Sequence, residues 1–149
     1  MSLTLALIRE AHARIKDKIN RTPVLTSATL DAQARAQLFF KCENFQKAGA
    51  FKARGATTAV FLLAEEEAQR GVATHSSGNH AAALARAAGL RGIPAHIVMP
   101  NNASQAKQAA VARYGAHIVL CEPTLAARES ACERVLAATG LIVPRTLEM

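Results

Sequence analysis

Short apolar runs alternate with longer amphipathic stretches over the second half of the chain. Beyond residue 70, four runs with strand character and three stretches with helical character follow in strict order: 72–75, 79–88, 95–99, 104–114, 117–121, 124–139 and 141–143. Short apolar runs separated by helices are typical of βαβ units in a parallel sheet. The pattern therefore predicts an α/β fold of three layers (αβα) around a four-stranded parallel sheet.

The first 70 residues follow a less regular pattern. The elements expected there are a helix at 4–20, a strand at 24–25, a helix at 27–35, a strand at 38–42, an irregular stretch at 43–50 and a helix at 51–69. Gly71 is the expected end of this last helix, because glycine is common just beyond helix C-termini. The regular alternation begins only after this residue.

Composition narrows the class of protein. The chain has 149 residues and 50% of them are hydrophobic, which argues against intrinsic disorder. No run of about 18 apolar residues suggests a membrane span, and the N-terminal residues lack the pattern of a signal peptide. Three cysteines without CxxC spacing are expected to be reduced thiols. These features predict a cytoplasmic protein with no membrane partner.

The net charge of +7 raises the question of a nucleic-acid partner. The 18 basic residues are spread without a block, and the six aromatic residues do not interleave with them, so no nucleic-acid partner is expected. Metal is not expected either, because His12, His75, His96 and His117 lack metal-ligand spacing. The last three fall in or beside predicted strands and are expected to be packed or capping groups.

A polar turn follows the first strand of the alternation, where the sequence reads Thr74-His75-Ser76-Ser77-Gly78-Asn79-His80. Free N–H groups at a helix start suit an anionic group such as a carboxylate, and parallel sheets bind ligands at the carboxyl ends of their strands. Serine and asparagine are also ordinary helix caps, so the turn by itself leaves both interpretations open.

Lys52 lies in the first turn of the helix expected over 51–69. The helix dipole disfavours a cation at this end, and the same environment favours the neutral amine that forms a Schiff base. An ordinary surface lysine is the alternative interpretation of this residue alone.

Further segments complete a recognisable pattern: Arg21-Thr22-Pro23-Val24-Leu25, Phe39-Phe40-Lys41-Cys42-Glu43, Asn44-Phe45-Gln46, Gly49-Ala50-Phe51-Lys52, Arg54-Gly55-Ala56, Gly92-Ile93-Pro94-Ala95 and Tyr114-Gly115-Ala116. Together with Ser76–His80, they resemble the fold-type II (tryptophan synthase β-like) pyridoxal-phosphate enzymes. Within that family the chain is most similar to the serine racemase and serine/threonine dehydratase group. The resemblance runs from about Ile8 to Pro144.

This resemblance implies pyridoxal 5′-phosphate as cofactor and gives roles to individual residues. Lys52 matches the lysine that forms a Schiff base with the cofactor and then acts as base at the substrate Cα. Phe51 matches the residue beside the cofactor ring, and Asn79 matches the side chain that hydrogen-bonds the ring 3′-hydroxyl. Ser77 matches the acid/base on the opposite face in racemases. The loop that holds the substrate carboxylate is matched by Ser76, Ser77, Asn79 and His80.

The chain departs from this family in length, since members normally run to more than twice as many residues. No two of the eight glycines are adjacent, so the family's Gly-rich phosphate loop is not expected here. The interpretation is a truncated enzyme: residues 1–50 are the N-terminal portion of the large domain, 51–144 the small αβα domain and 145–149 a divergent tail. Apolar surface on residues 1–50 is expected to be exposed and to favour a homo-oligomer.

The resemblance implies one main function with a small amino acid as substrate: deamination of L-serine, L-threonine or 3-hydroxyaspartate to a 2-oxo acid, or racemisation of serine. The alternatives are a catalytically inactive fragment or interaction module of the same fold, or another fold-type II branch such as threonine synthase or cysteine synthase. A nucleotide-binding Rossmann domain is disfavoured, because no GxGxxG follows a predicted strand.

Overall fold

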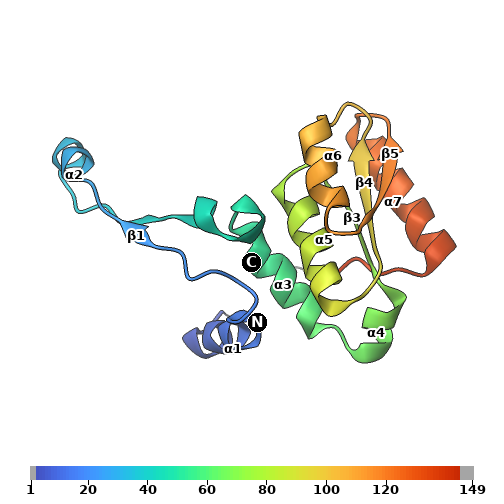
Figure 1. Ribbon diagram of the computed structural model, residues 1–149, viewed down its shortest axis with the longest axis horizontal. Helices are drawn as coiled ribbons and strands as arrows, with labels where there is room; N and C mark the ends of the chain where they lie inside the picture. The colour runs from blue at the N-terminus through green and yellow to red at the C-terminus, as the bar shows by residue number, and fades with distance from the viewer. Residues whose placement is uncertain (1–2, 145–149) are drawn as a thin grey trace.

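The computed structural model describes residues 3–144. Its helices are α1 (Leu5–Ile15), α2 (Ala28–Ala34), α3 (Lys52–Leu62), α4 (Glu65–Arg70), α5 (Asn79–Arg91), α6 (Gln105–Ala112) and α7 (Leu125–Thr139), with short 3₁₀ turns η1 (Glu43–Phe45) and η2 (Lys47–Gly49). Its strands are β1 (Val24–Leu25), β2 (Phe40–Lys41), β3 (Val72–His75), β4 (Ala95–Pro100) and β5 (His117–Cys121). The chain forms an α/β body and an arm that extends away from it (Figure 1).

The body is built on a parallel sheet with the strand order β3-β4-β5. Helices α5 and α6 cover one face and α7 covers the other (Figure 1). Because successive strand side chains point to opposite faces, Ile97 and Met99 of β4 pack with Leu84 of α5, whereas Val98 packs with Ala131 of α7. The three-layer α/β prediction is confirmed.

The prediction of a four-stranded sheet was wrong in its count. Within residues 3–144, the segment expected as the last strand contributes only an isolated parallel bridge between Ile142 and Val72. Ile142 donates its N–H to Gly71 O at 3.1 Å and accepts from Ala73 N at 2.8 Å. Proline at 144 has no N–H to donate, so this short run cannot extend the ladder in the usual way. The expected tail at 145–149 lies outside the described residues.

The helix predicted over 51–69 is two helices, because the backbone is extended at Leu63 and Ala64. Three glutamates begin α4, a favourable place for negative charge at a helix N-terminus. One of them, Glu67, also accepts a hydrogen bond from Ala64 N at 3.0 Å. Local capping at a new helix start therefore overrides the continuous helical pattern.

Helix α5 runs past its predicted end at Gly89 and closes at Gly92, which has a φ of 71°. Gly89 instead allows close packing, since a Cβ there would lie 3.1 Å from Tyr114 O. A glycine inside a helical pattern was thus mistaken for a helix end.

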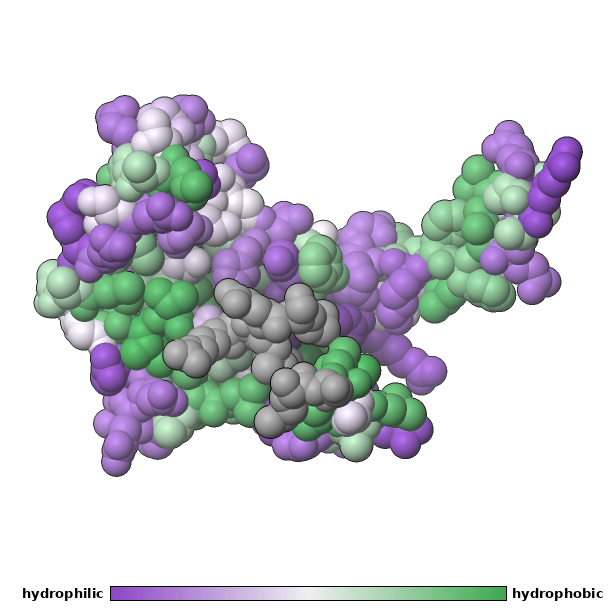
Figure 2. Space-filling view, turned by 180° about the vertical axis from the view of Figure 1, so that it is seen from behind, coloured by the Kyte–Doolittle hydropathy of each residue, from purple (hydrophilic) through white to green (hydrophobic). Residues whose placement is uncertain are grey.

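The arm consists of residues 23–42, with β1 and β2 paired antiparallel and α2 at its tip. Hydrophobic residues gather on the surface of this arm (Figure 2). Its exposed large apolar side chains are Val24, Leu25, Leu30, Phe39 (68% exposed) and Phe40. The outer face of α1 adds Leu5, Leu7 and Ile8. The prediction of exposed apolar surface on the N-terminal part is confirmed.

Candidate active site

Lys52 is the first residue of α3, as the sequence predicted. The residue before it, Phe51, occupies the N-cap position without making a side-chain cap, and its ring is 60% exposed. The Lys52 ammonium lies 5.2 Å from the centre of this ring. The structure therefore presents an exposed amine beside an exposed aromatic face.

The polar turn joins β3 to α5 at the carboxyl end of the sheet. Ser76 continues the strand ladder through its N–H, which bonds Val98 O at 3.0 Å, and its Oγ accepts from Gly78 N at 3.3 Å. Gly78 is the N-cap residue of α5 and can offer no side-chain cap. The first N–H groups of the helix, which have no intrahelical acceptor, are therefore left for another group.

Asn79 is exposed at the start of α5, while Ser76, Ser77 and His80 are half-buried. Helices α3 and α5 pack closely on each other, which brings the Lys52 end of one near the Ser76–His80 turn of the other. The pKa of His80 is lowered first by burial and then by the charges of Lys52 and His75. Lys52 and His75 thus lie close enough to His80 for their charges to act on it, and the neutral imidazole of His80 is favoured.

His75 is a residue beside this turn that the sequence did not single out. It ends β3, and its Nδ1 atom is buried with no hydrogen-bond partner among residues 3–144. Its position in an apolar strand favoured a packed histidine, and the buried Nδ1 atom without a partner is the observation that sets it apart from one. By contrast, His96 and His117 pack on each other across β4 and β5, with ring centres 4.8 Å apart.

A polar network lies directly behind the Lys52 helix start. Arg54 donates two hydrogen bonds to the Glu43 carboxylate, from Nε at 2.9 Å and from Nη2 at 2.7 Å. Thr22 donates its hydroxyl to the same carboxylate at 2.6 Å. These interactions lower the pKa of Glu43 to about 2, with the Arg54 hydrogen bond as the largest cause. Local patterns assigned no role to these residues, because their partners lie 11 to 32 positions apart.

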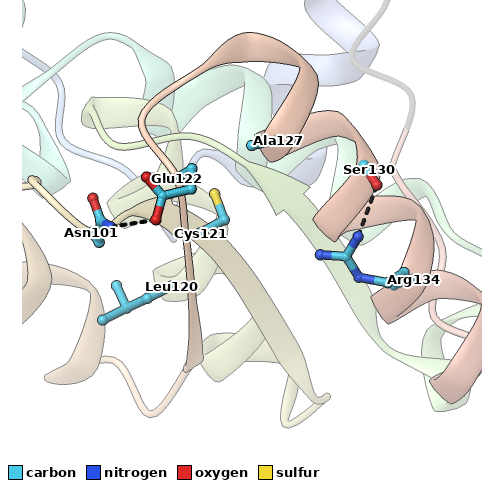
Figure 3. A pocket seen from close by; sticks show the side chains of 7 residues that line it. All are labelled: Asn101, Leu120, Cys121, Glu122, Ala127, Ser130 and Arg134. Carbon is cyan, nitrogen blue, oxygen red and sulfur yellow. Dashed lines mark hydrogen bonds between the residues drawn. The ribbon is translucent and has the colours of Figure 1, made fainter.

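A cavity of about 420 Å³ lies elsewhere on the sheet edge, between the end of β5 and α7 (Figure 3). Asn101 and Glu122 form one wall through a 3.2 Å hydrogen bond, and Arg134 with Ser130 forms the opposite wall. None of the predicted site residues lines this cavity. Among residues 3–144, no cluster of three or more His, Cys, Asp or Glu suited to a metal ion is found.

The family model for pyridoxal-phosphate dependent enzymes matches residues 15–148. The match takes in most of the chain, which therefore belongs to this family. Among curated relatives, serine racemase from Oryza sativa subsp. indica is 63% identical over 83 residues, 56% of this chain and 24% of that protein. The beta-hydroxyaspartate dehydratase of Paracoccus denitrificans (strain Pd 1222) is 64% identical over 78 residues, 52% of this chain and 25% of that protein.

Solved structures give the same picture at the level of the fold. Maize serine racemase is 49% identical with a TM-score of 0.93, over 99% of this chain and 45% of that one. The threonine deaminase of T.th. is 35% identical with a TM-score of 0.86, over 99% of this chain and 46% of that one. The chain therefore spans less than half of the length of these relatives. No helix in the described part of the chain is long and apolar enough to cross a membrane.

Proposed function

We propose that Lys52 carries pyridoxal phosphate and that this chain supplies the lysine and the substrate loop of a serine/threonine dehydratase or serine racemase. The observation that carries the proposal is the close packing of α3, which begins at Lys52, on α5, which begins directly after the Ser76–Gly78 turn at the carboxyl end of β3. Membership of the family and the names of the relatives support the cofactor and the substrate class.

The residues present fit such a cofactor. The exposed amine of Lys52 can bond an aldehyde, and the exposed ring of Phe51 offers a face beside it. The orphaned Nδ1 of His75 and the uncapped start of α5 provide polar groups that a bound anion would satisfy. The chemistry supplied by the bound cofactor is that of an electron sink, which makes the Cα–H bond of an amino acid acidic.

Under this proposal, the chain's own residues take the roles that the family resemblance implies for them. Lys52 Nζ is the base that takes the proton from the substrate Cα, and Ser77 Oγ is the acid/base on the opposite face. Asn79 holds the hydroxyl of the cofactor ring. The hydroxyl of Ser76, the imidazole of His80 and the N–H groups of α5 bind the substrate carboxylate. Substrates of this kind are L-serine, L-threonine or 3-hydroxyaspartate, and the product is a 2-oxo acid or the D-amino acid.

Borohydride trapping tests the lysine. Incubation with pyridoxal phosphate, reduction and peptide mapping should place the label mainly on Lys52, and Lys52→Ala should lose it. Lys107→Ala, which removes an exposed lysine of α6, is the matched control and should keep the Lys52 label. Labelling that is undiminished in Lys52→Ala would contradict the assignment.

Activity tests the reaction class. Pyruvate release and D-serine formation from L-serine should be measured alongside β-replacement. Release of pyruvate or D-serine supports the proposed branch, and β-replacement alone would favour the cysteine synthase branch. A chain that binds no pyridoxal phosphate at saturation would favour an inactive fragment or interaction module.

The domain assignment, the oligomeric state and the cellular location are part of the same proposal. We assign residues 51–144 to a small αβα domain and residues 1–50 to the N-terminal portion of a large domain, because the arm lies apart from the sheet (Figure 1). The exposed apolar side chains of the arm favour a homo-oligomer. The free thiols of Cys42, Cys121 and Cys132 favour a cytoplasmic location.

A further inference from the structure

The start of α3 is unusual for a helix that presents a functional lysine. Phe51 at the N-cap position provides no side-chain hydrogen bond, and the first turn contains no acidic residue. It contains instead the cations Lys52 and Arg54, which the helix dipole disfavours at this end. Something outside the helix must therefore hold its first turn in place.

The backbone of the segment that leads into α3 is also in a conformation that its own residues do not favour. Ala48 and Gly49 both have left-handed backbone angles, with φ values of 57° and 68°. Glycine adopts this region freely, but alanine does so rarely because its Cβ crowds the backbone. The turn at Ala48 thus depends on contacts with other parts of the chain.

Two buried polar side chains supply those contacts. Gln46 is 4% exposed, and its amide group bonds the backbone of Asn20 at two points: Oε1 accepts from Asn20 N and Nε2 donates to Asn20 O, both at 2.8 Å. Thr22, also 4% exposed, bonds the Glu43 carboxylate. The irregular stretch between α1 and β1 therefore anchors the 43–47 segment from outside.

The Glu43–Arg54 ion pair closes the arrangement. Nε and Nη2 of Arg54 meet the two carboxylate oxygens of Glu43 in a two-point geometry, which fixes orientation as well as distance. The pair joins residue 43 to the first turn of α3, and Lys52 lies inside the loop that it closes. The carboxylate also offsets the unfavourable cation in that turn.

We infer that Glu43 and Arg54 are positioning residues, which hold the first turn of α3 so that the Lys52 amine is aimed at the Ser76–His80 turn. The inference rests on the proposed role of Lys52 as the cofactor lysine. Neither side chain touches the reacting atoms in this scheme, since both act through the backbone between them.

The test is the selectivity of labelling among the six lysines of the 149-residue chain. Pyridoxal phosphate is trapped by borohydride, and the label on Lys52 is compared with that on the other five lysines by peptide mapping. In Glu43→Gln the share on Lys52 should fall at least about tenfold, because small displacements of a reacting group have large effects on rate. Labelling of Lys16, Lys18 and Lys107, which lie outside the Glu43 network, should stay unchanged, which a general loss of fold would not allow.

Two further variants keep the test decisive. Arg54→Lys retains the positive charge and loses the two-point geometry, so it replaces Glu43→Gln if that variant unfolds at the assay temperature. Because it introduces a seventh lysine, label at position 54 is mapped and counted separately from the label on Lys52. Its label on Lys52 should fall in the same direction. Glu10→Gln, which breaks the exposed Glu10–Arg14 pair of α1, is the control and should label as the wild type does.

The outcomes separate this inference from the proposed function. Preferential labelling of Lys52 in the wild type that persists in both Glu43→Gln and Arg54→Lys would overturn the positioning role alone. A wild type that labels all six lysines alike would overturn the role of Lys52, and with it this inference.

Discussion

The Glu43 carboxylate accepts hydrogen bonds from two distant parts of the chain, the Arg54 guanidinium and the Thr22 hydroxyl, and it also feels the charge of Lys41. Its side chain is 19% exposed and that of Arg54 is 32% exposed, so solvent screens the pair only partly. Because the pKa of Glu43 is lowered in the folded chain, the free energy of unfolding depends on pH.

Glu43→Gln should lower the free energy of unfolding at pH 7 by about 1–2 kcal/mol, because a charged hydrogen-bond acceptor is lost at a partly exposed site. The folded-state pKa of about 2 lies below the ordinary value of 4.5, so the stabilisation is complete above pH 4.5. It is lost as the pH falls towards 2. Urea unfolding at several pH values should show the gap between wild type and variant closing over this range. A gap that is independent of pH would contradict the assignment.

His80 also makes the stability of the fold depend on pH, at a higher pH than Glu43 does. Burial and the charges of Lys52 and His75 lower its pKa below the ordinary value of 6.5, so the unfolded chain binds a proton more readily. The free energy of unfolding should therefore decrease as the pH falls below 6.5. His80→Gln should reduce that slope, measured by urea unfolding, whereas His12→Gln on the exposed face of α1 should leave it unchanged.

Local sequence patterns were sufficient for part of the site and insufficient for the rest. Lys52 at a helix start and Ser76–Gly78 at a strand-to-helix turn depend on neighbours within a few positions. The Glu43–Arg54 pair and the Gln46–Asn20 clamp join residues 11 and 26 positions apart. Nothing in either local stretch indicates which distant residue will be its partner.

At the scale of elements, Gly71 lies between α4 and β3 and is closely surrounded by other parts of the chain. Its φ is 83°, and a Cβ would lie 2.6 Å from Leu141 Cδ2 and 2.7 Å from Pro94 O. The sequence marked this glycine as a helix end. The structure adds that the approach of the chain segments at 94 and 141 also requires it.

Gly71→Ala should destabilise the protein by about 2–4 kcal/mol, because left-handed strain and overpacking act together. Gly55→Ala is the matched control: Gly55 lies within α3, and a Cβ there meets no atom within 4 Å. That change should instead stabilise by about 0.5–1 kcal/mol. Urea unfolding of both variants checks the contrast, and equal effects would contradict it.

The order of the elements was predictable because apolar period and glycine position dominate it, and the three-layer body follows from that order. The boundaries of the elements were less predictable where two local signals competed. At Leu63 the helical pattern continues, but three glutamates just beyond it start a new helix. The fourth strand was predicted for a different reason. The apolar run at 141–143 has the composition of a strand, but whether it pairs beyond Ile142 depends on the residues that follow it and not on that composition.

At the scale of the whole molecule, the body has a core on both faces of its sheet, whereas the arm has none of its own. In the α/β body, buried residues such as Leu84, Ile97 and Val98 lie between sheet and helices. On the arm, Phe39 and Phe40 are exposed to solvent. Exposed apolar patches of this kind promote association.

The wild-type chain should therefore self-associate, with an average mass that rises with concentration in sedimentation velocity. Phe39→Ser/Phe40→Ser should shift the distribution towards monomer, because it removes the largest apolar groups of the arm. Leu90→Ser, at an exposed position near the end of α5, is the control and should have little effect. Equal association in wild type and double variant would show that the arm is not the contact.

The single bridge between Ile142 and Val72 has a consequence for the timescale on which the molecule opens. Successive amides of β3 point in opposite directions: Val72 N bonds Pro94 O at the start of β4, and Ala73 N bonds Ile142 O. Hydrogen exchange at the first reports opening of the sheet, and exchange at the second reports release of the segment that follows α7. Since Ile142 alone makes the backbone hydrogen bonds between that segment and the sheet, the Ala73 amide should exchange through a local opening, whereas the Val72 amide should exchange only when the sheet itself opens.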